Sequence, residues 1–145
     1  MRKLLFIISA VAFVFMMNAC HRSAPKANVI ELLQTDKAFS ELSVQKGKNH
    51  AFLEYIDTLG IMLRPGGMPI MGLDSLRIYQ SQHPDTSYTL SWDPLGAKIA
   101  QSGDLGFTYG VYTYKTKDTT FKGTYATVWT KTREGKWKMA LDVGN

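Results

Sequence analysis

Hydrophobic and polar positions between residues 28 and 45 recur with a helical period. At about 100° per residue, the apolar positions gather in one arc and the charged positions face the other way. The apolar arc consists of Val29, Leu32, Leu33, Phe39 and Leu42. Asn28 and Glu31 have the spacing of a capping box, so the pattern predicts an amphipathic helix that starts at Asn28 and runs to about Gln45.

Shorter elements follow this helix. Gly47 ends it, and Asn49 is placed to cap a second helix. The predicted inner face of the second helix holds Phe52, Tyr55 and Ile56. The next predicted elements are a strand over 61–63, a turn at Arg64-Pro65-Gly66-Gly67 and a helix over 72–80.

From residue 88 onward the apolar period changes to two, which is typical of strands. Four strands are predicted, over 88–102, 105–117, 120–133 and 136–143. Tight turns join them, so we expect an antiparallel meander with bends at Gly110 and Gly123. The fold class is therefore α+β, with three N-terminal helices on a strongly curved antiparallel sheet of four to six strands. A curved sheet with helices across its concave side encloses a cone. The open end of this cone suits a small molecule.

The N-terminus has a different pattern. After Arg2 and Lys3, residues 4–17 are apolar except for Ser9. As a helix this run would span about 21 Å, short of the ~30 Å hydrocarbon core, and its basic start is typical of a secretory signal. It ends in Met17-Asn18-Ala19-Cys20, which resembles the bacterial lipobox. We predict a signal peptide over 1–19, lipid on Cys20, a tether over 20–27 and one domain over 28–145. A signal peptide with an incidental cysteine, or an uncleaved anchor, are the alternatives.

The residues after Cys20 bear on location. His21 stands where an Asp would resemble an inner-membrane retention signal, and no acidic run follows. We therefore expect an outer-membrane lipoprotein that faces the periplasm rather than a cytoplasmic protein. Acyl chains on the cysteine would hold the domain at the membrane.

Composition limits the function classes further. The chain of 145 residues is 45% hydrophobic and 20% charged, which is ordinary for one globular domain. A single cysteine excludes an internal disulfide framework and a cysteine-based zinc site. Seven basic residues between 115 and 138 suit either anionic lipid headgroups or protection of strand edges. Nucleic-acid binding is not expected, because no recognised motif is present.

Asp36 is the most informative polar residue. It lies near the centre of the apolar arc, between Leu32 and Phe39, so it should face the interior. A buried carboxylate must be paired, hydrogen-bonded or protonated. It is either a pocket acid that contacts a ligand or moves a proton, or a structural pin to backbone amides, a Tyr or Trp, or Arg64.

The other candidates are a cation and several aromatic side chains. Arg64 is either a pocket cation for a carboxylate or phosphate, or the partner of an internal acid. The aromatic candidates for a ligand cradle, which would otherwise be core, are Tyr55, Trp92, Tyr109, Tyr125 and Trp129. Trp137 is expected in the core.

The remaining titratable groups point away from catalysis. His50 and His83 are not placed for metal or base chemistry, so no metal or cofactor is expected. Asp142 is out of phase with Trp137, Met139 and Leu141, so we expect it to face away from the helices, for example at a homodimer interface.

Four segments carry a resemblance to a known group of proteins. They are 32–40 (LLQTDKAFS), 63–67 (LRPGG), 102–110 (SGDLGFTYG) and 135–145 (GKWKMALDVGN). With the order of elements, they make residues 28–145 resemble the SnoaL-like group of the nuclear transport factor 2-like (NTF2-like) superfamily, closest to the family called domain of unknown function 4440. This superfamily contains isomerases, dehydratases and cyclases as well as non-catalytic binding and assembly domains.

The resemblance also supplies a test for two enzyme classes. Members similar to steroid isomerases use an Asp-Pro step whose equivalent here is Arg64-Pro65, and arginine is no base at neutral pH. Polyketide-cyclase-like members often carry histidines where this chain has Leu141 and Val143. We therefore favour a module that binds a small, partly apolar molecule. The alternatives are an isomerase, dehydratase or hydrolase using Asp36 and Arg64, and a homodimeric assembly module.

Overall fold

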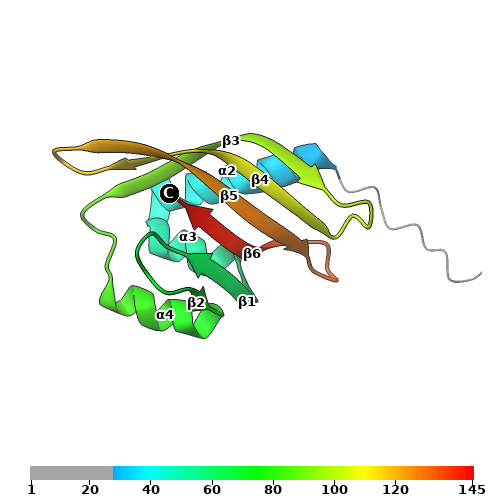
Figure 1. The fold of residues 1–145 in the computed structure, drawn as a ribbon, viewed down its shortest axis with the longest axis horizontal. Helices are drawn as coiled ribbons and strands as arrows, with labels where there is room; N and C mark the ends of the chain where they lie inside the picture. The colour runs from blue at the N-terminus through cyan, green and yellow to red at the C-terminus, as the bar shows by residue number, and fades with distance from the viewer. Residues whose placement is uncertain (1–27) are drawn as a thin grey trace, which may run out of the picture.

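The computed structural model describes residues 28–145 (Figure 1). The predicted signal peptide, the lipidated Cys20 and the tether lie outside these residues, and they stay predictions. Of the helices within 28–145, none is both long and apolar enough to cross a membrane.

Three helices form where the apolar pattern predicts them. Helix α2 (Val29–Lys46) starts at Asn28, whose side chain accepts a hydrogen bond from the Ile30 amide at 2.9 Å. It ends at Gly47, whose φ of 88° favours glycine. Helices α3 (Lys48–Tyr55) and α4 (Leu73–Gln82) follow. The predicted third helix is thus confirmed, two residues longer at its end. Ile56 leaves the second helix and begins a strand instead.

The six strands form one mixed sheet in the order β2-β1-β6-β5-β4-β3. Their bounds are β1 Ile56–Leu63, β2 Ile70–Met71, β3 Thr89–Ile99, β4 Leu105–Lys115, β5 Thr120–Lys131 and β6 Trp137–Gly144. The antiparallel meander of β3 to β6 is confirmed. The expectation of a purely antiparallel sheet is wrong, because β1 pairs with β6 in parallel. Strand β2 was not predicted, since two residues carry no periodic signal.

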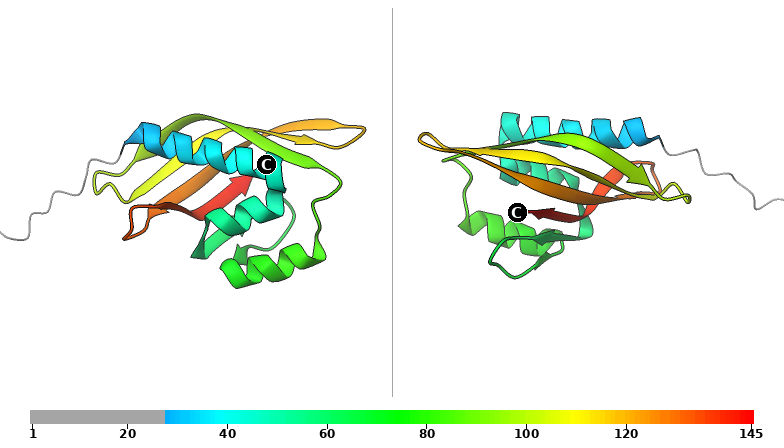
Figure 2. Two further views of the ribbon diagram at one scale, coloured as in Figure 1. Left: turned by 180° about the vertical axis from the view of Figure 1, so that it is seen from behind. Right: turned by 45° about the horizontal axis from the view of Figure 1, so that its top comes forward.

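The sheet curls around the helices without closing (Figure 2). Helix α2 lies across one face, and α4 lies beyond β1 and β2. Two buried serines hold α2 against β3. The Ser43 hydroxyl donates to the Leu90 carbonyl at 2.7 Å, and the Trp92 amide donates to the Ser40 hydroxyl at 2.7 Å. The predicted α+β cone is therefore confirmed.

Aromatic side chains fill the space between α2 and the sheet. Phe39 is 1% exposed, and its ring centroid lies 4.5 Å from that of Trp92 and 4.9 Å from that of Phe52. Trp129 packs against Phe39 edge to face and is fully buried. This core fills the space under α2, and a cavity lies beside it, next to α3 and the end of β6.

Candidate functional site

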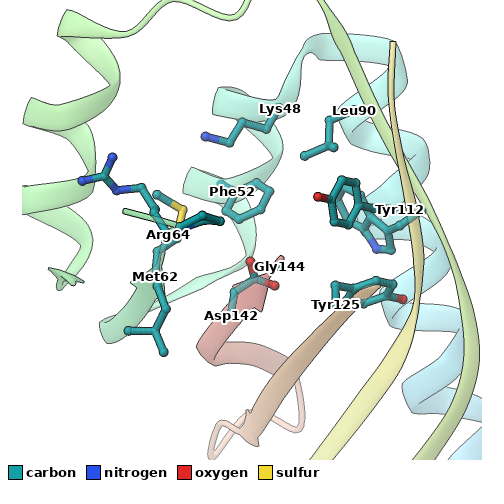
Figure 3. A pocket seen from close by; sticks show the side chains of 12 residues that line it. Lys48, Phe52, Met62, Arg64, Leu90, Tyr112, Tyr125, Asp142 and Gly144 are labelled. Carbon is teal, nitrogen blue, oxygen red and sulfur yellow. The ribbon is translucent and has the colours of Figure 1, made fainter. Parts of the chain in front are cut away.

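A cavity of about 210 Å³ opens at the wide end of the cone (Figure 3). Its wall is mostly apolar and aromatic, and three charged side chains interrupt it. The lining residues with functional interest are Lys48, Phe52, Arg64, Trp92, Tyr112, Tyr125 and Asp142. They come from α3, β3, β4, β5, β6 and the end of β1, so the cavity depends on segments that are far apart in the sequence.

Asp36 fixes two of the aromatic walls from behind. Its carboxylate is fully buried, accepts a hydrogen bond from Trp92 Nε1 at 2.8 Å and accepts another from the Tyr125 hydroxyl at 2.7 Å. Burial raises the pKa of Asp36, and the bonds from Tyr125 and Trp92 oppose this rise. Asp36 is not part of the cavity wall. Of the two interpretations of this residue, the geometry supports the structural pin, with a Tyr and a Trp as partners.

The hydroxyls of Tyr125 and Tyr112 both donate to acceptors within the protein. Burial, followed by the charge of Asp36, raises the pKa of Tyr125, so its hydroxyl stays a donor to that carboxylate. The Tyr112 hydroxyl donates to the Asn145 carbonyl at 2.5 Å. The ring of Tyr112 passes close to Gly123, where a Cβ would lie 2.5 Å from the tyrosine oxygen. Glycine at 123 therefore lets the ring lie flat along the cavity wall.

Asp142 lies inside the cavity, and the expectation that it faces away from the helices is wrong. A bulge in β6 explains the error. Val128 pairs with Leu141 but Trp129 pairs with Met139, so Ala140 has no partner of its own. One extra residue reverses the alternation. Met139 and Asp142 both end on the inner face, and Leu141, which was expected inside, turns outward.

The carboxylate of Asp142 has one donor within the protein. The Thr127 hydroxyl donates to its Oδ2 at 2.7 Å, while Oδ1 accepts no hydrogen bond from residues 28–145. Burial raises the pKa of Asp142 to about 6; the bond from Thr127 opposes the rise and nearby Asp36 adds to it. This acid therefore changes its protonation state close to neutral pH.

Two cations stand on the side of the cavity that faces α4. The Arg64 Nη1 donates to the Tyr79 hydroxyl at 3.1 Å, and the guanidinium lies 4.4 Å from the centre of that ring. Lys48 lies over the ring of Phe52 at 5.1 Å. Burial lowers the pKa of Lys48, Asp85 and Asp142 oppose the effect, and Arg64 adds to it. Sequence reasoning missed Lys48, because a single lysine in a first helical turn carries no signal.

The other aromatic candidates lie elsewhere. Trp129 is core and donates to the Thr108 hydroxyl at 2.9 Å. Tyr55 stacks on Phe39 and borders a separate groove. Tyr109 is 48% exposed on the outer face of the sheet. Trp137 is buried, as expected. Within 28–145, no three metal-ligating side chains of the His, Cys, Asp or Glu type cluster together.

Solved structures of similar shape place this arrangement among known folds. An NTF-2-like protein of unknown function from Shewanella oneidensis aligns with a TM-score of 0.63 and 17% identity, over 79% of this chain and 96% of that one. A ketosteroid isomerase-like protein from Erwinia carotovora aligns with a TM-score of 0.60 and 15% identity, over 79% of this chain and 92% of that one. A domain of unknown function with a cystatin-like fold from Nostoc punctiforme aligns with a TM-score of 0.66 and 14% identity, over 80% of this chain and 75% of that one. The chain has the NTF2-like fold. No protein-family model and no curated protein matches the sequence.

The raised pKa of Asp142 makes a stability prediction for this NTF2-like domain. In the folded state the pKa of Asp142 is about 6, against an ordinary value of 3.8. Raising the pH from about 4 to 6 therefore lowers the stability of the folded state, because the unfolded chain releases this proton more easily. Asp142→Asn has no such charge. We expect urea unfolding at pH 7 to show the variant more stable than wild type, by on the order of 3 kcal/mol, with the difference shrinking toward pH 4.

Asp118→Asn is the matched control, because Asp118 lies exposed in the turn between β4 and β5. It should leave the free energy of unfolding within about 0.5 kcal/mol of wild type. A difference between Asp142→Asn and wild type that stays constant from pH 4 to 7 would contradict the assignment.

Proposed function

We propose that this protein binds a small, partly apolar molecule in the cavity at the wide end of the cone. One observation carries the proposal: a space of about 210 Å³ is walled by the rings of Phe52, Trp92 and Tyr125 and holds the free Oδ1 of Asp142. Such combinations of apolar wall and few polar groups are typical of ligand sites. The four resembling segments support placing the domain in the SnoaL-like branch, near the domain of unknown function 4440 family.

Binding is testable through the three tryptophans of the chain. Trp92 lines the cavity, whereas Trp129 and Trp137 do not. In a ¹H–¹⁵N spectrum of residues 21–145, single-ring probes such as phenol and benzoate should shift the indole N–H signal of Trp92 and leave the signals of the other two tryptophans in place. Leu90→Trp fills the cavity and should remove the shift.

Val44→Trp is the control for that substitution, because Val44 is 54% exposed on α2. It should preserve the response of Trp92. Native mass spectrometry of protein purified from its own host should show an added mass that denaturation releases. A spectrum in which no probe moves the Trp92 signal, together with a bare mass, would refute the proposal.

Catalysis is a second candidate, and one observation favours it. A carboxyl group whose pKa is about 6 can both accept and donate a proton near neutral pH, and Asp142 presents one oxygen to the cavity. Arg64 at the rim could stabilise a developing negative charge. An isomerase, dehydratase or hydrolase of this kind would use Asp142 as its acid and base, because Asp36 is sealed behind Trp92 and Tyr125.

We further propose that the domain is held at the outer membrane by lipid on Cys20. The lipobox-like sequence around this residue supports the proposal, and it is the only cysteine, so a labelled acyl chain has one thiol to occupy. Expressed in a lipoprotein-processing bacterium, the full chain should incorporate labelled palmitate and sediment with outer membranes. Cys20→Ser should lose both properties with an unchanged fold. Labelling of the serine variant, or a soluble wild type, would contradict this assignment.

The partner we propose is a second copy of the chain. Leu105, Phe107 and Tyr109 alternate along β4 and are 40–48% exposed on one outer face, an apolar surface of the type that proteins cover. Light scattering should give twice the mass of one domain, and a Phe107→Lys, Tyr109→Lys double variant should give one. Ile78→Lys, exposed on α4, should stay dimeric. A monomeric wild type at 50 µM, or a dimeric double variant, would exclude this interface.

A further inference from the structure

The aromatic walls of the cavity offer a ligand almost no hydrogen bonds. Trp92 Nε1 and the Tyr125 hydroxyl both donate to Asp36, and the Tyr112 hydroxyl donates to the Asn145 carbonyl. Each of these donors is therefore already used within the protein. What remains toward the cavity is the flat face of each ring, which suits another flat ring.

Polarity in the cavity is consequently confined to three side chains. Figure 3 shows Lys48 and Arg64 extending toward α4, on the side opposite Tyr112 and Tyr125, with the carboxylate of Asp142 between the two sides. Neither cation forms a salt bridge with a residue of 28–145. Two cations with no salt-bridge partner in this part of the chain can together bind an anion, and a guanidinium suits a carboxylate in particular.

Arg64 has donors to spare for such an anion. Nη1 is held by Tyr79, but Nη2 has only a long contact of 3.5 Å to the Met68 carbonyl, and Nε is buried with no partner among the described residues. Gly67 lies against this group, where a Cβ would be 2.7 Å from Nη2, so the turn places no side chain beside that nitrogen. The stacking on Tyr79 fixes its orientation.

The size of the cavity limits the ligand to about one ring. A cavity of roughly 150 Å³ holds a benzene molecule, and drug-sized ligands occupy roughly 300 Å³ or more. The space here is about 210 Å³, which leaves room for a ring and one or two small substituents. A steroid or a fused polycyclic compound would not fit wholly within it.

We propose that the ligand is a single-ring aromatic carboxylate that also carries a hydrogen-bond donor. Its ring lies against Trp92, Tyr112 and Tyr125, its carboxylate binds Lys48 and Arg64, and its donor binds Oδ1 of Asp142. This rests on the proposed binding function and names the class of molecule that the cavity selects. The anionic group determines selectivity, because the rings would accept a neutral compound of the same shape equally well.

Three probes of nearly equal size test this class by calorimetry on residues 21–145. They are 4-hydroxybenzoate, its neutral analogue 4-hydroxybenzamide, and benzoate, which lacks the hydroxyl donor. We expect 4-hydroxybenzoate to bind at least tenfold more tightly than the amide, because charge-assisted hydrogen bonds are the stronger ones. It should bind several-fold more tightly than benzoate, because only its hydroxyl can donate to Asp142.

Matched variants assign these preferences to residues. Arg64→Gln and Lys48→Gln should each bring the ratio of acid to amide affinity close to one, whereas Asp142→Leu should remove the preference for the hydroxyl. Arg77→Gln is the control, since Arg77 lies exposed on α4 and contacts Asp74 outside the cavity. It should leave both ratios unchanged.

The outcomes distinguish failure of the proposed ligand class from failure of the proposed binding function. If the amide binds as tightly as the acid to wild type, the carboxylate class is wrong while ring binding stands, and this result needs no variant to fold. If Arg64→Gln and Lys48→Gln both keep a tenfold ratio, the cation pair is not the anion site. If neither phenol nor any of the three probes shifts the Trp92 signal, and native mass spectrometry shows a bare mass, the binding function itself fails.

Discussion

The Asp36 carboxylate is the interaction on which the rest of the domain depends. It joins α2 to β3 through Trp92 and to β5 through Tyr125, so one buried group ties a helix to two strands that are not neighbours in the sheet. Burial of a charge is costly unless it is fully hydrogen-bonded, and here both oxygens are occupied. The same two bonds orient the rings that wall the cavity, so stability and site geometry share one cause.

Strand β6 determines which polar group the cavity contains. Because Ala140 is inserted without a partner, the inner face of β6 changes from Met139 to Asp142 within three residues. The first part of the strand completes the core under α2, and the last part places a carboxylate at the wide end. A regular strand would have put Leu141 there, and the cavity would then have no acid.

Most of the fold follows from local periodicity, and the site does not. The helical arc from Leu32 to Leu42 suffices for the first helix, and the period of two after residue 88 suffices for four strands. The burial of Asp36 is visible in the same arc. The bulge at Ala140, the parallel pairing of β1 with β6 and the approach of Lys48 to Asp142 arise from contacts between distant segments. No pattern within one segment encodes them.

The parallel pairing of β1 with β6 has a consequence for how the domain is made. Ile61 and Leu141 are register partners although eighty residues separate them, and the cavity wall draws on both strands. Strands β1 and β2 can therefore join the sheet only after β6 has been synthesised. The large sequence separation between β1 and β6 slows the formation of this contact. Until then the inner rings lie uncovered, so the incomplete chain exposes apolar surface for longer than a helical bundle of equal length would.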